Sequence, residues 1–216
     1  MSRKADPTIR GRLLAAARAE FSAHGLDGAR MGNITARAGV SKGTFYLHFR
    51  SKEDAFEEVA NEFFSAFFGH LDGIEALLTS EREPTEVLSE LHRRDLAMLE
   101  FLWTERDFGR LLFEGARSPR QRHLIEAFAA RIQERVEQFL AIDQARGRLL
   151  PGIDIRTLAQ FIAGGFDRYA RVLLSSPNKP DIERDLHAFH EFICRGCTTP
   201  ECQQMLGIGT EPASSS

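Results

Sequence analysis

Hydrophobic positions recur at helical spacing along almost the whole chain. In the first segment Ile9, Leu13, Ala17 and Phe21 follow one another at four-residue steps. Residues three or four apart lie on one face of an α-helix, so this spacing predicts an amphipathic helix. The sequence contains no run of β-branched residues bounded by turn signals that would indicate a sheet. The pattern therefore predicts an all-α fold.

Glycine and capping residues mark the ends of the first three helices. Asp6 suits the N-cap and Pro7 the first position of helix one, and Gly25 is expected to end it. Gly39 then separates a short second helix from a third, which Ser41 can cap. Two short helices joined by such a turn are the outline of a helix-turn-helix, whose second helix enters the major groove of DNA.

Prolines and one capping pair divide the rest of the chain. Ser51 and Asp54 form a near capping box that opens a long fourth helix. Further periodic segments are separated by Pro84, Pro119, Pro151, Pro177 and Pro180, and a shorter piece covers residues 108–117. We expect about nine helices in three parts: a three-helix DNA-binding domain over 1–52, linked by helix four from residue 51 to a helical domain over 53–202, and a disordered tail over 203–216.

The charge distribution supports a DNA-binding first part. Residues 1–50 contain nine Lys or Arg and three Asp or Glu, a net charge of +6, so the rest of the chain, whose total is −3, carries −9. A basic module on an acidic body suits contact with phosphates, although a chance cluster of solvated charges remains the alternative. The sequence contains no secretory segment and no run of about 18 apolar residues, so we expect a cytoplasmic protein without a membrane partner.

The stretch VSKGTFYLHFRSKEDAF, residues 40–56, has more polar groups than apolar anchors. Helical spacing turns Val40, Phe45 and Phe49 inward, which leaves the polar side chains outward. Lys42 can meet phosphate or guanine, and Gly43 lets the backbone approach the groove. The predicted DNA-binding residues are Arg30, Ser41, Lys42, Gly43, Thr44, Tyr46, His48 and Lys52.

The same residues carry a family resemblance. GNITARAGVSKGTFYLHFRSKEDAF resembles the helix-turn-helix signature of the TetR family of bacterial transcriptional regulators, and the match extends back through AAARAEFSAHGLDGAR to cover about residues 7–56. Ala29 stands where a Thr commonly opens helix two. This departure is expected to weaken an N-terminal cap or a phosphate contact, unless Arg30 takes the place of the Thr. Thr35 replaces a usual Ala, at little cost if its hydroxyl bonds a helix carbonyl.

The resemblance implies a regulator that works as a homodimer on double-stranded operator DNA. It implies a repressor that a small effector of unknown identity releases from a palindromic operator, although activation stays open. The aromatic residues of the middle helices indicate a hydrophobic or aromatic effector. We expect no cofactor and no enzymatic activity, because the sequence has no Gly-rich phosphate loop, nucleophile elbow or H-E-x-x-H pattern. A helical protein-interaction adaptor is a further alternative, but it leaves the basic first fifty residues unexplained.

Two later segments are candidates for the dimer and the effector. Residues 154–174 combine large apolar and small residues, which favours close approach of a partner helix, while an intrachain core helix kinked at its glycines is the alternative. The dimer candidates are Phe161, Gly164, Gly165, Val172, Leu186, Phe189 and Ile193.

The middle helices are rich in aromatic residues, which suits an apolar pocket or simply a Phe-rich core. The pocket candidates are Phe101, Trp103, Phe108, Phe113, Phe128, Phe166 and Tyr169.

A cluster of His and Cys near the C-terminus suggests another kind of regulator. His187, His190, Cys194, Cys197 and Cys202 have the spacing H-x2-H-x3-C-x2-C-x4-C. Such residues can bind zinc or cycle between thiol and disulfide, which would make the protein a metal- or redox-responsive regulator. A single C-x2-C is a weak signal, and free cysteines are often buried small hydrophobes. We therefore expect no bound metal, with these residues as the candidates if one binds.

Overall fold

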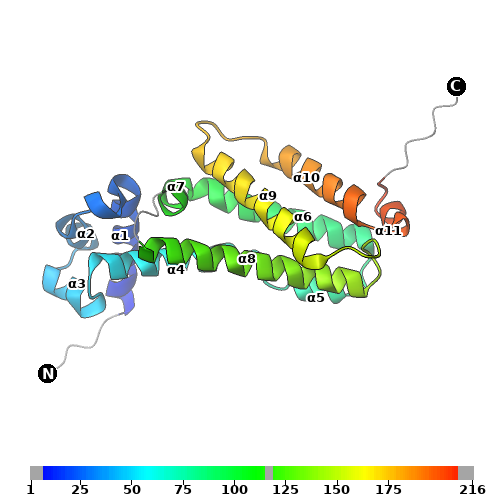
Figure 1. The fold of residues 1–216 in the computed structure, drawn as a ribbon. Coiled ribbons are helices and arrows are strands. Elements are labelled where there is room, and N and C mark those ends of the chain that lie inside the picture. The colour runs from blue at the N-terminus through cyan, green and yellow to red at the C-terminus, as the bar shows by residue number, and fades with distance from the viewer. Residues whose placement is uncertain (1–6, 115–118, 209–216) are drawn as a thin grey trace. The chain divides into compact units, whose positions relative to one another are not determined.

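The computed structural model describes residues 7–114 and 119–208, and all their regular secondary structure is helical apart from an isolated bridge between Leu149 and Thr198. The all-α prediction is confirmed. The described residues form eleven helices (Figure 1): α1 (Pro7–Gly28), α2 (Met31–Ala38), α3 (Lys42–His48), α4 (Lys52–Gly69), α5 (Ile74–Thr79), α6 (Pro84–Thr104), α7 (Arg106–Glu114), α8 (Pro119–Ala145), α9 (Ile155–Ser175), α10 (Ile182–Cys197) and α11 (Pro200–Met205).

Two short helices, α5 and α11, add to the nine that the sequence predicted. Helix α11 takes up residues 203–205, so this part of the predicted tail is ordered as helix, whereas residues 209–216 and the predicted cap Asp6 lie outside the described residues. Thr199 caps α11, because its hydroxyl accepts the Cys202 N–H at 3.3 Å. None of the helices in the described ranges is long and apolar enough to span a bilayer.

The contacts divide the chain into two compact units. The first comprises residues 1–66 and 105–127, and the second comprises residues 67–104 and 128–216. The first unit thus contains α1, α2, α3, most of α4 and α7, whereas α5, α6, α9, α10 and α11 belong to the second. The division into a DNA-binding domain ending at residue 52 and a larger helical domain stays a prediction.

A cluster of phenylalanines forms the core of the first unit. The Phe21 ring of α1 meets Phe56 of α4 at 5.3 Å between centroids, and Phe108 of α7 lies 5.9 Å from Phe56 and 5.8 Å from Phe63. Arg18 covers Phe108, with its guanidinium carbon 5.3 Å from the ring centroid, and donates to Glu105 at 2.6 Å. Aromatic pairs of this kind add to the free energy of burial and fix helix positions.

Glycines shape the backbone at two points of the first unit. Gly25 has φ of 68° and non-helical geometry, so the first long helical segment of α1 stops there, as predicted, and a short further piece continues α1 to Gly28. Gly39 has φ of 66° and ends α2, as predicted. Both angles lie in the left-handed region that side chains with a β-carbon avoid, so glycine at these positions permits the kink and the tight turn.

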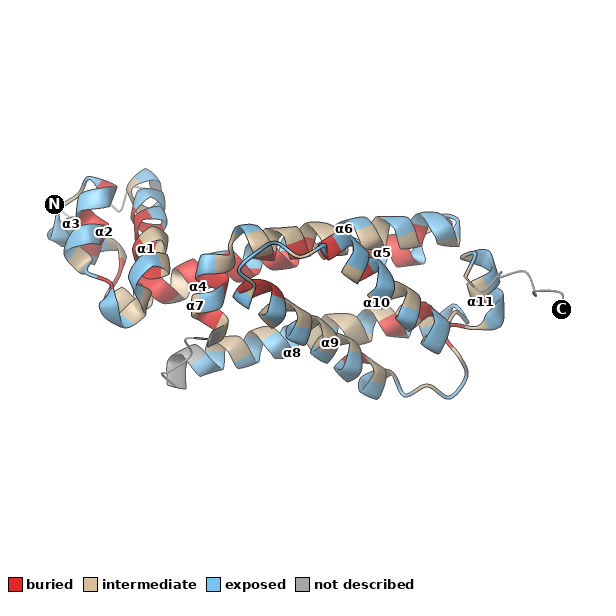
Figure 2. Cartoon of the chain, turned by 90° about the horizontal axis from the view of Figure 1, so that it is seen from above, coloured by how far each residue is buried: buried red, intermediate tan, exposed pale blue. Residues whose placement is uncertain are grey.

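In the second unit, α6 packs against both α9 and α10. The last turn of α4 contributes Phe67 and Phe68, whose rings lie 5.1 Å and 5.4 Å from that of Phe128 on α8. A smaller apolar cluster joins Leu140, Leu149 and Ala159. Helices α9 and α10 carry exposed positions along much of their length (Figure 2).

Candidate functional site

Helix α3 is held by one cap and two buried rings. The Ser41 hydroxyl caps it by accepting the Thr44 N–H at 3.1 Å, as predicted. Phe45 and Phe49 are buried with their rings 5.2 Å apart. Tyr46, in edge contact with Phe45, is 58% exposed. The helix therefore directs its aromatic anchors inward and Tyr46 outward, which agrees with the predicted orientation.

Most of the predicted DNA-binding residues are exposed, and they lie in or next to α3 and at the start of α2. Arg30, Ser41, Lys42 and Gly43 are exposed, and much of α3 is pale blue in Figure 2. Leu47, which the sequence analysis missed, is 54% exposed. The spacing contained the signal, since Leu47 is two residues from both Phe45 and Phe49 and so lies on the opposite face of the helix.

Two predicted DNA-binding residues also make contacts within the protein. The Lys52 ammonium donates to the backbone carbonyls of Asp27 at 3.3 Å and Ala29 at 3.2 Å, so it ties the end of α1 to the start of α4. His48 is half-buried, and its Nδ1 is buried with no hydrogen-bond partner among the described residues. Their side chains are thus partly turned toward the protein.

A buried carboxylate supports the start of α2. Glu20 Oε1 accepts the Arg30 N–H at 3.0 Å and the Asn33 side-chain amide at 2.9 Å. The Arg30 N–H is the main cause that lowers the pKa of Glu20, and it outweighs the opposing effect of burial. Glu20, on another helix, thereby accepts the backbone N–H of the N-cap residue Arg30 and holds the Asn33 side chain, a role that the sequence analysis assigned to no residue.

Thr35 behaves as expected for a hydroxyl in a helix interior. It is buried, and its hydroxyl donates to the carbonyls of Met31 and Gly32, both at 3.1 Å. The departure from the family pattern at this position therefore leaves its hydroxyl satisfied.

Comparisons with known proteins agree with this helix-turn-helix. The family model described as "Bacterial regulatory proteins, tetR family" matches residues 13–59. The HTH-type transcriptional regulator UidR of Escherichia coli K12 is 30% identical over 161 residues, which cover 71% of this chain and 75% of UidR. The chain belongs to the TetR family. It is therefore a DNA-binding transcriptional regulator and not an enzyme.

Solved structures show that the TetR-family fold extends over nearly the whole chain. SmeT, the repressor of the Stenotrophomonas maltophilia multidrug efflux pump SmeDEF, gives a TM-score of 0.72 at 20% identity, covering 89% of this chain and 92% of SmeT. The SmeT–triclosan complex gives a TM-score of 0.75 at 20% identity, and the match covers 90% of this chain and 93% of the SmeT chain. At this level of identity, the comparison shows that the two proteins share a fold.

The predicted dimer residues of this TetR-family regulator divide into two groups. Phe161 is 75% exposed, Val172 is 41% exposed, and Gly164 is also exposed. Phe192, which the sequence analysis did not name, is 74% exposed on α10. These four residues, Phe161, Gly164, Val172 and Phe192, are called the α9–α10 apolar surface below.

The second group packs inside the chain. Leu186 is buried, and Ile193 is half-buried. A β-carbon added at Gly165 would lie only 3.1 Å from Cε2 of Phe189, so the helix that approaches Gly165 is α10 of the same chain. The intrachain alternative therefore accounts for Gly165 and Phe189, and Leu186 belongs to the chain's own core.

The predicted pocket aromatics belong to several separate packing arrangements. Phe108 is in the core of the first unit, whereas Phe128 packs on α4 in the second. The Phe166 ring lies 4.8 Å from that of Phe189, and the Phe101 ring lies 5.6 Å from that of His70. The core interpretation thus accounts for Phe108 and Phe128.

The remaining pocket candidates are half-buried. Trp103 and Phe113 are intermediate in exposure. The Tyr169 hydroxyl donates to Asp185 at 3.1 Å, and burial followed by this bond raises the pKa of Tyr169 to about 12. The phenol therefore stays protonated across the physiological range.

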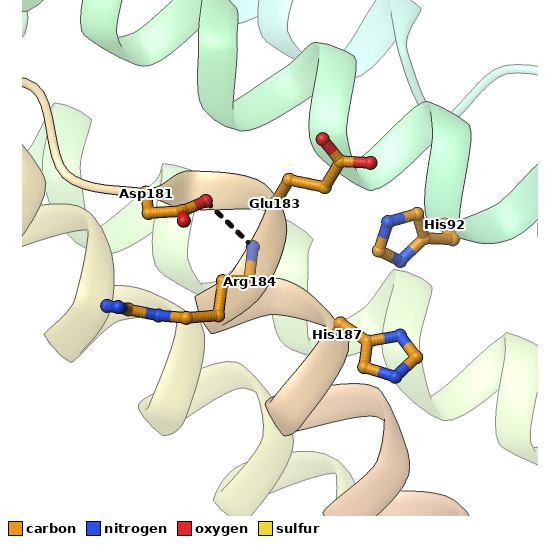
Figure 3. A pocket seen from close by; sticks show the side chains of 5 residues that line it. All are labelled: His92, Asp181, Glu183, Arg184 and His187. Carbon is orange, nitrogen blue, oxygen red and sulfur yellow. Dashed lines mark hydrogen bonds between the residues drawn. The ribbon is translucent and has the colours of Figure 1, made fainter.

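A polar pocket that the sequence did not predict lies between α6 and α10. It is open, with a volume of about 360 Å³, and is lined by His92, Asp181, Glu183, Arg184 and His187 (Figure 3). Beside it, His92 Nδ1 lies 3.2 Å from His190 Nδ1, and His190 Nε2 lies 2.9 Å from Asp95 Oδ2. Burial, with the facing His190 and His187, lowers the pKa of His92.

The five residues of the predicted His and Cys cluster have different surroundings. Cys194 and Cys202 are buried, and burial is the main cause that raises the pKa of Cys194 to about 11 and that of Cys202 above its ordinary value. The thiolate is the reactive and metal-binding form, so these thiols are poorly suited to either role. Within the described ranges, no three His, Cys, Asp or Glu side chains converge closely enough to form a complete metal site.

Proposed function

We propose that this TetR-family regulator is a homodimeric repressor that binds a palindromic operator and is released by a small, hydrophobic or aromatic effector. The observation that carries the proposal is the outward face of α3. Lys42, Tyr46 and Leu47 are exposed there above the buried Phe45 and Phe49. A cation, a phenol and an apolar side chain on one helix match phosphate oxygens, base edges and thymine methyl groups in a major groove.

The α9–α10 apolar surface supports the homodimer. An exposed phenylalanine ring on each of α9 and α10, Phe161 and Phe192, is unusual on a monomer, and with the exposed Gly164 on α9 it suits packing against a second helix pair. In a two-fold dimer each residue of this surface is used twice. Such a dimer would present two α3 helices to half-sites one helical turn of DNA apart, roughly 34–36 Å.

The aromatic content of the second unit supports a hydrophobic or aromatic effector. SmeT, a structural neighbour, is captured in complex with triclosan. In this chain, half-buried aromatic side chains in the second unit offer apolar contact area, namely Phe101, Trp103, Phe166 and Tyr169. The dimer would have one conformation whose two α3 helices are spaced to fit the operator and another in which they are not. An effector that binds the second conformation more tightly lowers operator affinity, and the size of the decrease is set by the difference between its affinities for the two conformations.

The test is selection of duplex DNA by the purified protein, followed by affinity measurements at two salt concentrations. We expect a palindromic site whose affinity falls steeply as the salt concentration rises, because each DNA-binding domain would contact several phosphates. Tyr46→Ala should lower affinity for the selected site about tenfold or more, and Tyr46→Phe, which keeps the ring, should lower it less. An unenriched pool, or equal affinity for wild type and Tyr46→Ala, contradicts the proposal.

A further inference from the structure

Two stripes of ionisable side chains face each other where α6 packs against α10. On α10, Glu183, His187 and His190 are spaced by four and three residues, which places them on one face of the helix. On α6, His92 and Asp95 are three residues apart. We propose that a divalent transition-metal ion of the zinc class binds between these helices, held by Nδ1 of His92 and Nδ1 of His190.

The separation of the two nitrogens fits a shared ion. They lie 3.2 Å apart, and the ring centroids lie 5.3 Å apart. Two nitrogens bound to one tetrahedral zinc ion with bonds of about 2.0–2.1 Å are themselves about 3.3 Å apart. In the proposed site an ion replaces the proton that the two rings share, and the rings turn so that both nitrogens point to an ion beside the line that joins them.

Asp95 orients the His190 ring for this role. Its carboxylate lies 2.9 Å from His190 Nε2 and can only accept, so Nε2 carries the proton of the neutral ring. The lone pair is then on Nδ1, the atom that faces His92. A carboxylate on the far nitrogen of a metal-binding histidine is a common arrangement, because it fixes the tautomer and raises the basicity of the ligand.

The polar pocket supplies the third ligand and the route of entry. His187 lines it, with its ring centroid 6.3 Å from that of His92, about 1 Å further than His190 is. His187 is outside ligand distance in this conformation, so it becomes the third ligand only after its side chain changes rotamer, and water can occupy the fourth position. Imidazole ligands favour zinc, copper, nickel and cobalt over magnesium and calcium. Figure 3 shows the His92 and His187 rings at one side of the open pocket.

The proposal is tested on the untagged full-length protein with cobalt as the probe. We expect one Co²⁺ per chain, visible absorption typical of tetrahedral cobalt, and displacement by Zn²⁺. The near-ultraviolet band of a cobalt–thiolate bond should be missing, because the ligands are imidazoles and the thiols of Cys194 and Cys202 are buried. Zinc should also raise the melting temperature of the wild type, since binding to the folded state stabilises it.

Matched variants separate this site from other histidines and from the cysteines. His92→Gln and His190→Gln should each weaken cobalt binding about 100-fold or more. Asp95→Asn, which removes a positioning residue, should weaken it about 10–100-fold. His123→Gln, an exposed histidine of α8, and Cys194→Ser should leave binding unchanged.

The variant melting curves report folding independently of binding, so a variant that fails to fold is recognised. His187→Gln then serves as the second test, with binding weakened about tenfold and the His92–His190 pair intact. Three outcomes overturn the proposal: no saturable binding by the wild type, equal binding by wild type and His190→Gln, or binding lost in Cys194→Ser. None of these measurements depends on DNA binding, so they are independent of the proposed repressor function.

Discussion

The outward face of α3 and the α9–α10 apolar surface both expose large apolar or aromatic side chains, but with different neighbours. On α3, Tyr46 and Leu47 lie among a lysine, a serine and a glycine. On α9 and α10, Phe161 and Phe192 are accompanied by Gly164 and Val172. An exposed ring is thus informative only with its surroundings: polar neighbours fit a hydrated, charged groove, and small apolar neighbours fit another protein surface.

The largest effect is expected from placing a charge on the α9–α10 apolar surface. In the proposed homodimer, Phe192→Asp removes two rings from the two-fold interface, about 1.5–3 kcal/mol each, which corresponds to a dimer dissociation constant raised about 10²- to 10⁴-fold. Sedimentation measures the change. Met205→Asp, at another exposed apolar residue, should leave the dimer intact. If the Phe192→Asp protein remained as dimeric as the wild type, the α9–α10 apolar surface would not be the dimer interface.

The next largest effect concerns the carboxylate behind α2. Glu20→Gln should lower the free energy of unfolding by about 1.5–3 kcal/mol at pH 7, because a neutral amide oxygen accepts the two hydrogen bonds more weakly than the carboxylate does. The pKa of Glu20 is lower in the folded state than its ordinary value of 4.5. Its stabilisation is therefore fully present above about pH 4.5 and is lost as the pH falls through the lowered pKa. Urea unfolding from pH 7 to pH 3 should show the difference between wild type and variant shrinking.

A smaller effect is expected at Leu47. If one carbon of this side chain is buried against a thymine methyl group in each half-site, Leu47→Ala loses about 0.8 kcal/mol per half-site, about 1.6 kcal/mol or roughly 10- to 20-fold over a palindrome. Uracil in place of thymine in the selected operator removes the methyl group from the DNA side. Wild type should lose affinity on the uracil operator, while Leu47→Ala should bind both operators alike. Additive losses would mean that Leu47 contacts something else.

The smallest effect should come from the cap of α3. Ser41→Ala leaves the Thr44 N–H without its 3.1 Å acceptor and should cost about 1 kcal/mol of stability. Ser51→Ala is a matched control, because Ser51 caps α4 by accepting the Asp54 N–H, also at 3.1 Å. Both variants should be destabilised alike in urea, but only Ser41→Ala should also weaken operator binding, which a filter or anisotropy titration measures.

The local parts of the fold could be predicted from the sequence. The Ser41 cap, the inward Phe45 and the turn at Gly39 depend on residues within four positions of one another, so their spacing is visible in the chain. The same spacing could have identified Leu47 as exposed.

The parts that could not be predicted depend on partners far apart in the chain. Glu20 is ten residues from Arg30, and His190 is 98 residues from His92, so nothing in the local pattern connects them. Helical periodicity indicated that Leu186 lies on an apolar face, but not that its own chain covers it. The buried environment that raises the pKa of Cys194 is likewise a product of tertiary packing.

The contact between Gly165 and Phe189 has a consequence for motion along the helix axes. A shift of α9 by one turn, about 5.4 Å, would bring the β-carbon of Phe161 or Tyr169 to the place where the Phe189 ring now lies 3.1 Å from the position of a β-carbon. Sliding between α9 and α10 in either direction therefore requires the Phe189 ring to move aside. Without that movement, the contact at Gly165 favours one register of the two helices.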